Sequence, residues 1–194
     1  MSLQKDQHYI DRTIAGDTKA YAFLIDRYKH MVYTLALRMV KNKEEAEEVA
    51  QDTFLKVYKG LHSFKGDSKF STWIYKIAYN RSLDYVKKQS RSLETTTIDK
   101  VAERYVVAIE NTLAGLERKD RRNTIKEAMK ELSGDDSFLI TLHYYEELSL
   151  SEIAAIMNLS ANTVKVRLFR TRKRLAKILK DRLEPEIIEG YGKK

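Results

Sequence analysis

The near absence of proline constrains the possible folds of this chain more than any other feature of the sequence. Pro185 is the only proline among 194 residues, and the seven glycines stand where helices are expected to stop or turn. Between these positions apolar residues recur every three or four places, which is the period of one face of an α-helix. The spacing predicts an all-α fold, with helices over residues 17–40, 44–59, 70–88, 118–132, 137–145, 149–157 and 160–179.

The helical pattern divides into two parts separated by a polar stretch. Residues 1–88 are expected to form one small helical domain and residues 117–182 a second. Between them, residues 89–116 lose the helical period and gather serine and threonine, which predicts a flexible linker. Residues 183–194 are left as a C-terminal tail.

Composition argues against several classes of chemistry. The chain has no cysteine, so disulfides, thiolate metal sites and cysteine nucleophiles are excluded. Its four histidines are scattered without partners at metal spacing, and the sequence shows no nucleophile–base pair and no glycine-rich phosphate loop. We therefore expect no enzyme activity, cofactor, metal or small-molecule substrate. The formal net charge of +8 favours a polyanion as partner.

The N-terminus lacks the apolar segment of a signal peptide. No apolar run approaches the length needed to cross a bilayer. The sequence therefore predicts a cytoplasmic protein without membrane insertion.

The segment from Phe70 to Lys88 has two apolar sides with an unusual strip between them. The strip carries Trp73, Lys76, Asn80 and Lys87. Lysine neutralises phosphates and aromatic rings stack on bases, so the strip suits unpaired nucleic acid. The alternative is that Trp73 is a core aromatic and that the lysines are solvated charges. Spacing alone does not choose between the two.

The segment from residue 149 to residue 179 reads as a helix-turn-helix. Ser149 and Glu152 form a capping box in front of a short apolar helix. Asn158 follows at the turn, where asparagine tolerates the left-handed conformation, and Ser160 can cap the next helix. A short helix, a tight turn and a longer helix are the plan of this DNA-binding motif.

The second helix of the motif separates apolar from basic residues. Its buried face is expected to hold Val164, Leu168, Leu175, Ile178 and Leu179. The opposite arc holds Lys165, Val166, Phe169, Arg170 and Lys173, with Arg167, Arg172 and Arg174 at the flanks. An exposed phenylalanine among cations suits a major groove, where it can touch a thymine methyl group. The alternative is a basic amphipathic helix that docks on an acidic protein or a membrane surface.

At these residues the chain resembles a bacterial RNA polymerase sigma factor of the extracytoplasmic-function (ECF) class of the sigma-70 family. The matching blocks are Gly16-Asp17, Tyr33–Ala36, Ala46–Phe54, Phe64–Trp73, Ile77–Asp84, Leu148–Ala154 and Thr163–Arg170. The resemblance implies a transcription initiation factor that binds core RNA polymerase and directs it to promoter DNA. It also implies control by a membrane-associated anti-sigma protein.

The resemblance assigns roles to individual residues. Glu48, Gln51 and Asp52 match positions that dock on a coiled coil of the largest polymerase subunit. The minus-ten element would be melted and held by Phe64, Lys65, Lys69, Trp73, Lys76, Asn80 and Lys87. The minus-thirty-five element would be bound by Thr163, Lys165, Val166, Arg167, Phe169, Arg170, Arg172 and Arg174, with Arg167 and Arg172 on phosphates.

Three departures from the family pattern are visible. Val166 stands where serine is common, Asn158 replaces a turn glycine, and Ser133-Gly-Asp-Asp136 replaces a turn that contains proline. Two other functions are alternatives to this one. A stand-alone helix-turn-helix regulator has no use for an aromatic and basic strip in its other domain. A metal-dependent nuclease would need an inward-facing set of ligands, which Glu44 to Asp52 does not supply.

Overall fold

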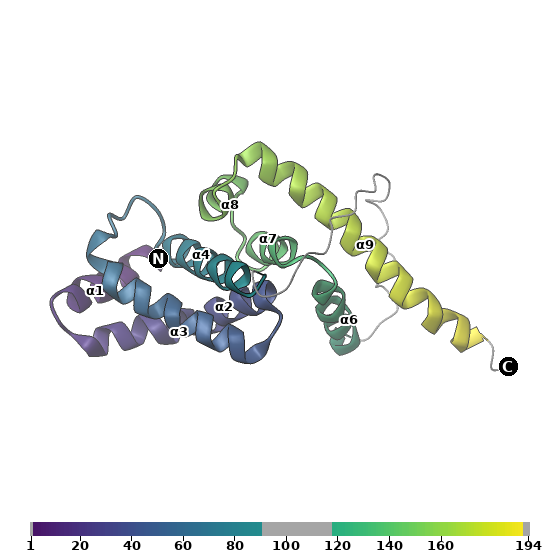
Figure 1. Ribbon diagram of the computed structural model, residues 1–194, viewed down its shortest axis with the longest axis horizontal. Coiled ribbons are helices and arrows are strands. Elements are labelled where there is room, and N and C mark those ends of the chain that lie inside the picture. Colours follow the sequence, from purple (N-terminus) through teal and green to yellow (C-terminus); the bar gives the residue numbers. More distant parts are fainter. Residues whose placement is uncertain (1, 91–117, 192–194) are drawn as a thin grey trace.

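The computed structural model describes the backbone of residues 2–90 and 118–191, and the side chains of residues 6–89 and 123–182. Regular structure within these ranges is entirely helical, as the sequence predicts (Figure 1). The elements are α1 (Ser2–Ile14), α2 (Thr18–Val40), α3 (Lys43–Gly60), the 3-10 turn η1 (Leu61–Ser63), α4 (Phe70–Ser90), α6 (Arg118–Lys130), α7 (Gly134–Tyr144), α8 (Leu150–Met157) and α9 (Ala161–Tyr191). Most of the predicted linker lies outside the described residues. None of the described helices is both long and apolar enough to span a membrane.

Side-chain caps set where the helices begin. Asp17 accepts hydrogen bonds from two backbone N–H groups at the start of α2, and Asn42 accepts one at the start of α3. Ser133 caps α7, and Ser149 forms the predicted capping box with Glu152 at α8. Each cap of this kind contributes about 1 kcal/mol to helix stability.

The first domain packs α1, α3 and α4 around α2. The helices predicted from the sequence begin at Asp17, and the structure adds α1 over residues 2–14, which lies against α2. Ile10 of α1 is buried, and Asp6 accepts a hydrogen bond from the Tyr28 hydroxyl at 2.7 Å. Asp6 also pairs with Arg27 at 2.9 Å. These partners are about twenty residues away along the chain, so the local pattern does not reveal them.

Two aromatic side chains that the helical period places inside lie at the surface instead. Phe23 of α2 is exposed and stacks on Tyr9 of α1, with ring centroids 4.9 Å apart. Tyr58 of α3 is exposed beside Tyr21, also at 4.9 Å. The helical spacing over residues 44–59 predicts that Tyr58 faces inward, and that prediction is wrong. Periodicity assigns a residue to a face but not the extent to which neighbouring helices cover that face.

The second domain consists of α6 to α9, and α8 with α9 forms the predicted helix-turn-helix. Asn158 adopts the left-handed conformation at the turn, with φ of 54°. The buried face of α9 holds Val164, Leu168, Leu175 and Leu179, as predicted, whereas Ile178 is only half-buried. The backbone of α9 continues to Tyr191, past residue 182 where the sequence places the end of the domain.

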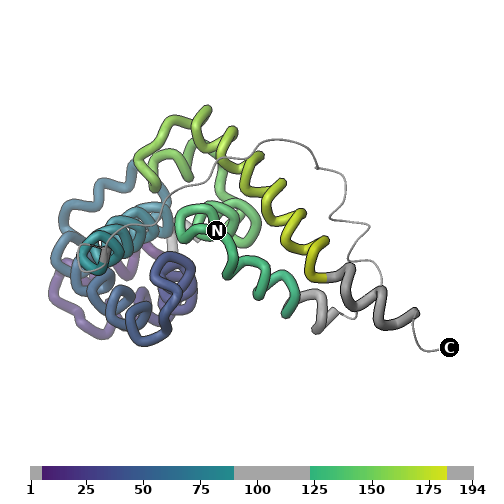
Figure 2. The backbone as a smooth tube through the Cα atoms, turned by 45° about the vertical axis from the view of Figure 1, so that its right-hand side comes forward, coloured from purple at the N-terminus to yellow at the C-terminus, as the bar shows by residue number. Residues whose placement is uncertain are grey.

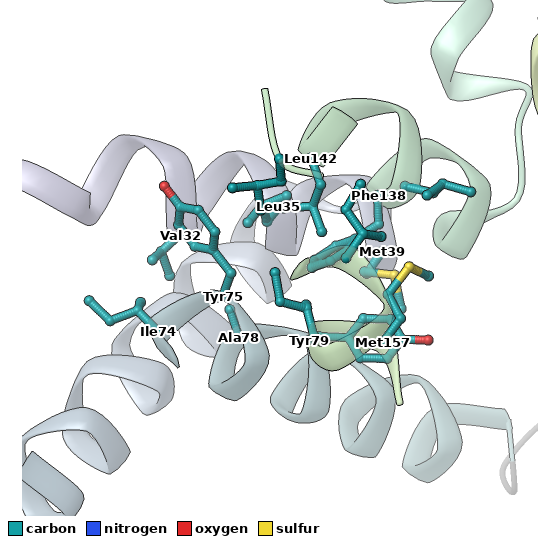
Figure 3. Packing of buried hydrophobic residues seen from close by; sticks show 14 of the residues in the cluster. Val32, Leu35, Met39, Ile74, Tyr75, Ala78, Tyr79, Phe138, Leu142 and Met157 are labelled. Carbon is teal, nitrogen blue, oxygen red and sulfur yellow. The ribbon is translucent and has the colours of Figure 1, made fainter. Parts of the chain in front are cut away.

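The two domains share one hydrophobic core. α4 packs against α8, and α2 packs against α7, so two helices of the first domain contact the second (Figures 1 and 2). Core side chains around this junction are Met39, Tyr75 and Tyr79 from the first domain and Phe138, Leu142 and Met157 from the second (Figure 3). The sequence predicts two domains joined by a flexible linker and does not predict contact between them.

Candidate nucleic-acid interface

An aromatic cluster stands where α4 begins. Phe70 is buried, and its ring stacks on Trp73 with centroids 5.7 Å apart. Phe64, from the loop before α4, lies 5.4 Å from the Trp73 ring between centroids. Trp73 and Phe64 are both half-buried. The two alternatives for Trp73 are therefore not exclusive, because the indole rests on the core and still presents surface on which a base could stack.

Polar side chains continue from this cluster along α4 and its leading loop. Lys76 is exposed one turn beyond Trp73, and Asn80 is half-buried one turn further. Lys65 and Lys69 are exposed in the loop, and Lys87 is exposed near the end of the helix. The residues that the sequence assigns to the minus-ten element thus all lie on α4 or on the loop that leads into it. Lys69 also pairs with Glu152 of α8 at 3.1 Å.

The two apolar sides of α4 are covered by different neighbours. Ile74 is buried within the first domain, and Tyr75 and Tyr79 are buried toward the second. Tyr75 donates a hydrogen bond to Glu146, and Tyr79 donates one to Asp135 at 3.2 Å. Burial and then the Asp135 carboxylate raise the pKa of Tyr79 to about 12. Its hydroxyl therefore stays protonated, and can donate to Asp135, to higher pH than that of an ordinary tyrosine.

α9 presents an apolar pair within a basic surface. Val166 and Phe169 are 42% and 47% exposed, and Lys165 and Arg170 are exposed beside them. The Nζ atom of Lys173 lies 4.4 Å from the centre of the Phe169 ring, a cation–π contact. Phe169 points away from the core, as predicted. In helix-turn-helix proteins the N-terminal part of the second helix contacts base edges, which is where these side chains lie.

Arg167, which the sequence assigns to a phosphate, is engaged within its own domain. Its Nε donates to Asp136 at 2.8 Å, and its guanidinium pairs with Asp135 at 3.2 Å. Arg174 donates to Asp136 at 3.3 Å. Burial by itself would lower the pKa of Arg167, but the two carboxylates outweigh burial and the pKa is raised. These pairs hold α9 against the start of α7, and the phosphate role of Arg167 stays a prediction.

Two further predicted residues have partners within the second domain. The guanidinium of Arg172 lies 5.9 Å from the centre of the Tyr144 ring, and Tyr144 is 49% exposed. Sequence reasoning missed Tyr144, which belongs to α7. Thr163 is exposed, and its hydroxyl shares a hydrogen bond with Ser160 at 2.8 Å in the cap of α9.

The acidic face of α3 lies at the surface. Glu48, Gln51 and Asp52 are all exposed there. Leu55, which sequence reasoning missed, follows four residues after Gln51 and three after Asp52, and it is 58% exposed. That spacing puts Leu55 on the same face of α3, so Leu55 could have been predicted from the sequence. The result is an acidic surface with an apolar side chain at one end.

Within the described residues, no group of three histidine, aspartate or glutamate side chains is placed to hold a metal ion.

Comparison with known proteins places the chain in a family. A model described as Sigma-70 region 2 matches residues 24–92, and one described as Sigma-70, region 4 matches residues 122–175. The ECF RNA polymerase sigma factor SigW of Bacillus subtilis is 36% identical over 175 residues, which cover 86% of this chain and 92% of SigW. This chain belongs to the ECF class of the sigma-70 family. It is therefore a transcription initiation factor.

Other relatives are similar in sequence to this sigma factor over most of its length. The ECF RNA polymerase sigma-E factor of Escherichia coli is 35% identical over 174 residues, covering 87% of this chain and 91% of the relative. The RNA polymerase sigma-H factor of Pseudomonas aeruginosa is 31% identical over 185 residues, covering 92% and 96%. Among solved structures, the sigma factor RpoE of Bartonella quintana, in complex with the anti-sigma factor NepR, is similar with a TM-score of 0.63 and 25% identity. That similarity covers 84% of this chain and 98% of RpoE.

Proposed function

We propose that this sigma factor reads a promoter at two places, with α4 and its leading loop at the minus-ten element and with α9 at the minus-thirty-five element. The observation that carries the proposal is that each helix leaves an aromatic ring partly exposed among cations. These rings are Trp73 on α4 and Phe169 on α9. A nucleic acid suits both features, because its bases can stack on the rings and its phosphates can pair with the surrounding cations.

At the minus-ten element, Trp73 and Phe64 would stack on unpaired bases while Lys76 neutralises the backbone. Asn80 would offer its amide to the edge of a captured base. Flipping a base costs a few kcal/mol, and stacking on an aromatic ring returns about 1–3 kcal/mol per base. Two partly exposed rings and one amide are thus of the right magnitude to hold a melted strand.

At the minus-thirty-five element the target is duplex DNA. Arg170 and Lys165 would reach base edges, where one good bidentate contact is worth about 1–3 kcal/mol of discrimination. Val166 and Phe169 would contact thymine methyl groups in the major groove. Because Val166 offers no hydroxyl, this position would read shape and methyl groups and not a hydrogen-bond donor or acceptor.

The acidic face of α3 would bind core polymerase. Glu48, Gln51 and Asp52 suit a basic helix of the largest subunit, and Leu55 would add an apolar contact at the end of the same face. We infer that an anti-sigma protein regulates the factor, which the similarity to the RpoE–NepR complex supports. We also infer that the factor acts in the cytoplasm and catalyses no reaction itself.

Run-off transcription with core polymerase on a genomic library tests the proposal. Addition of the protein should produce discrete start sites preceded by two common sequence elements. A protein that binds duplex DNA but leaves core polymerase inert would instead be a stand-alone helix-turn-helix regulator.

A further inference from the structure

Three arginines flank the basic surface of α9, and they have different kinds of partner. Arg167 and Arg174 both donate to Asp136 of α7, at 2.8 and 3.3 Å. Arg172 instead has an aromatic partner, because its guanidinium lies over the ring of Tyr144. Within the described residues Arg172 forms no ion pair with a carboxylate. A ring face attracts a cation but does not neutralise its charge, so the charge of Arg172 stays available to another partner.

The two ends of α7 place these partners on opposite sides of α9. Arg172 and Arg174 are two positions apart and therefore point about 160° apart around the helix. Asp136 lies in the first turn of α7, and Tyr144 is its last residue. α7 packs against α9, and its 11 residues span about 16 Å, which exceeds the helix diameter of about 10–12 Å. One end of α7 therefore reaches the flank of Arg174, and the other end reaches the flank of Arg172.

The Tyr144 ring has a second aromatic neighbour within the same domain. The ring of His143 meets it edge to face, with centroids 4.9 Å apart and planes at 79°. The Nδ1 atom of His143 lies 3.3 Å from the carbonyl oxygen of Leu148, which is buried. Tyr144 is nevertheless 49% exposed. Its ring is therefore a supported platform at the surface and not a part of the core.

Arg172 continues the surface that is assigned above to the minus-thirty-five element. Lys165, Phe169 and Arg172 follow the spacing i, i+4 and i+7, which puts them on one side of α9. Arg172 lies about 10 Å along the helix from Lys165, and the major groove is about 12 Å wide. The N-terminal part of the second helix contacts base edges. A cation two turns further along the same side therefore lies near the edge of the groove, where the phosphates are.

We propose that Tyr144 and Arg172 form a phosphate-binding site between α7 and α9, in which Arg172 pairs with one phosphate of the duplex and Tyr144 is the residue that positions it. The site rests on the proposed function and adds α7 to the DNA-binding surface. A phosphate contact carries no sequence information, so the site fixes the orientation of α9 on the duplex and not the choice of base. Arg167 and Arg174 are engaged by Asp136 and are not part of the site.

Arg172→Ala, Tyr144→Phe and Tyr144→Leu test the site. The chain in complex with core polymerase is bound to a promoter duplex identified by run-off transcription, over a series of salt concentrations. Arg172→Ala should lower the slope of log K against log salt by about 0.9 and weaken binding roughly fivefold at about 0.15 M salt. Tyr144→Phe keeps the ring and should bind like the wild type. Tyr144→Leu loses the ring and should weaken binding about two- to fourfold.

A double-mutant cycle distinguishes positioning from a merely structural role. Because Tyr144 acts through Arg172, Tyr144→Leu should have no further effect in an Arg172→Ala chain. Tyr145→Leu is the matched control, since it removes a ring that is 58% exposed at the neighbouring position, and it should match the wild type in slope and affinity. Tyr144→Met takes the place of Tyr144→Leu in the cycle if circular dichroism shows that Tyr144→Leu is not folded.

Two results would overturn the proposal. One is an unchanged salt slope in Arg172→Ala, which would assign the pair to the fold or to an acidic protein partner. The other is a loss of affinity in Tyr144→Leu that is equally large with and without Arg172. A wild-type chain that directs no transcription would refute the proposed function instead, which keeps the two failures distinct.

Discussion

Replacing Arg167 and Arg170 separately by alanine should distinguish a structural cation on α9 from one that reads DNA. Arg167 pairs with Asp136, whose side chain is 11% exposed, whereas Arg170 is exposed. Removing one partner of a fully buried ion pair costs about 3–5 kcal/mol. The Arg167 side chain is 30% exposed and Arg174 still pairs with Asp136, so we expect Arg167→Ala to lower the free energy of unfolding by about 1–2 kcal/mol.

Arg170→Ala should behave in the opposite way. An exposed side chain without a structural partner affects stability by at most about 0.5 kcal/mol when removed. Loss of one good base contact should weaken binding to the minus-thirty-five duplex by about 1–3 kcal/mol, or roughly 5- to 150-fold. Urea denaturation followed by circular dichroism measures the first quantity, and binding to the duplex across a series of salt concentrations measures the second.

The salt series also provides the refutation. A side chain that contacts a phosphate lowers the slope of log K against log salt by about 0.9 when it is removed. Arg167→Ala should leave that slope unchanged. If Arg167→Ala keeps full stability and lowers the slope by about one, Arg167 contacts a phosphate and its pairs with Asp135 and Asp136 do not stabilise the fold.

Three other predictions concern α8, α3 and α4. Hydrogen bonds from Ser149 lower the pKa of Glu152, so its stabilisation of α8 is present above the ordinary glutamate pKa of about 4.3 and is lost as the pH falls through the lowered value. The unfolding free energy should therefore fall on acidification below about pH 4.3 in the wild type, but less so in Glu152→Gln. Leu55→Ala should weaken binding to core polymerase by about fivefold, or 1 kcal/mol, with Lys56→Ala close to wild type in a competition assay. Trp73→Ala and Asn80→Ala should slow promoter opening, followed by permanganate reactivity of unpaired thymines, without changing polymerase affinity.

Each of these has a result that contradicts it. An identical acid response of Glu152→Gln and wild type would show that the carboxylate charge does not stabilise α8. Equal polymerase affinities for Leu55→Ala and Lys56→Ala would remove Leu55 from the interface. Loss of polymerase binding by a folded Trp73→Ala chain would mean that the α4 strip has been assigned to the wrong partner.

Features that depend on neighbours along the chain could be predicted from the sequence. The cap at Asp17, the capping box of Ser149 with Glu152 and the left-handed Asn158 are each set by residues within four positions. The exposure of Phe169 follows from the helical period of α9 in the same way. Local propensity and periodicity operate over one or two turns of helix, which is why these predictions agree with the structure.

Features that depend on how helices meet could not be predicted. Phe23 is apolar and in phase with its helix, yet α1 covers only part of it and leaves it exposed. Arg167 lies at the flank of a basic face, and nothing near it in the sequence indicates that Asp135 and Asp136 would reach it from α7. A charge on a helix flank can face solvent, DNA or a neighbouring helix, and only the packing angle of that neighbour decides which.

The sequence by itself therefore determined the helices that follow Asp17, the exposed basic face of α9 and the resemblance to one family of transcription factors. The tertiary structure decided that the two domains share a core, that Tyr75 meets Glu146 across 71 positions of sequence, and that Lys69 is held by Glu152. The physical reason is the separation along the chain of the residues that interact. A backbone hydrogen bond of an α-helix joins residues four apart. The junction instead joins residues far apart in the sequence, and it is packed so closely that a Cβ atom at Gly134 would lie 2.9 Å from the carbonyl oxygen of Met39.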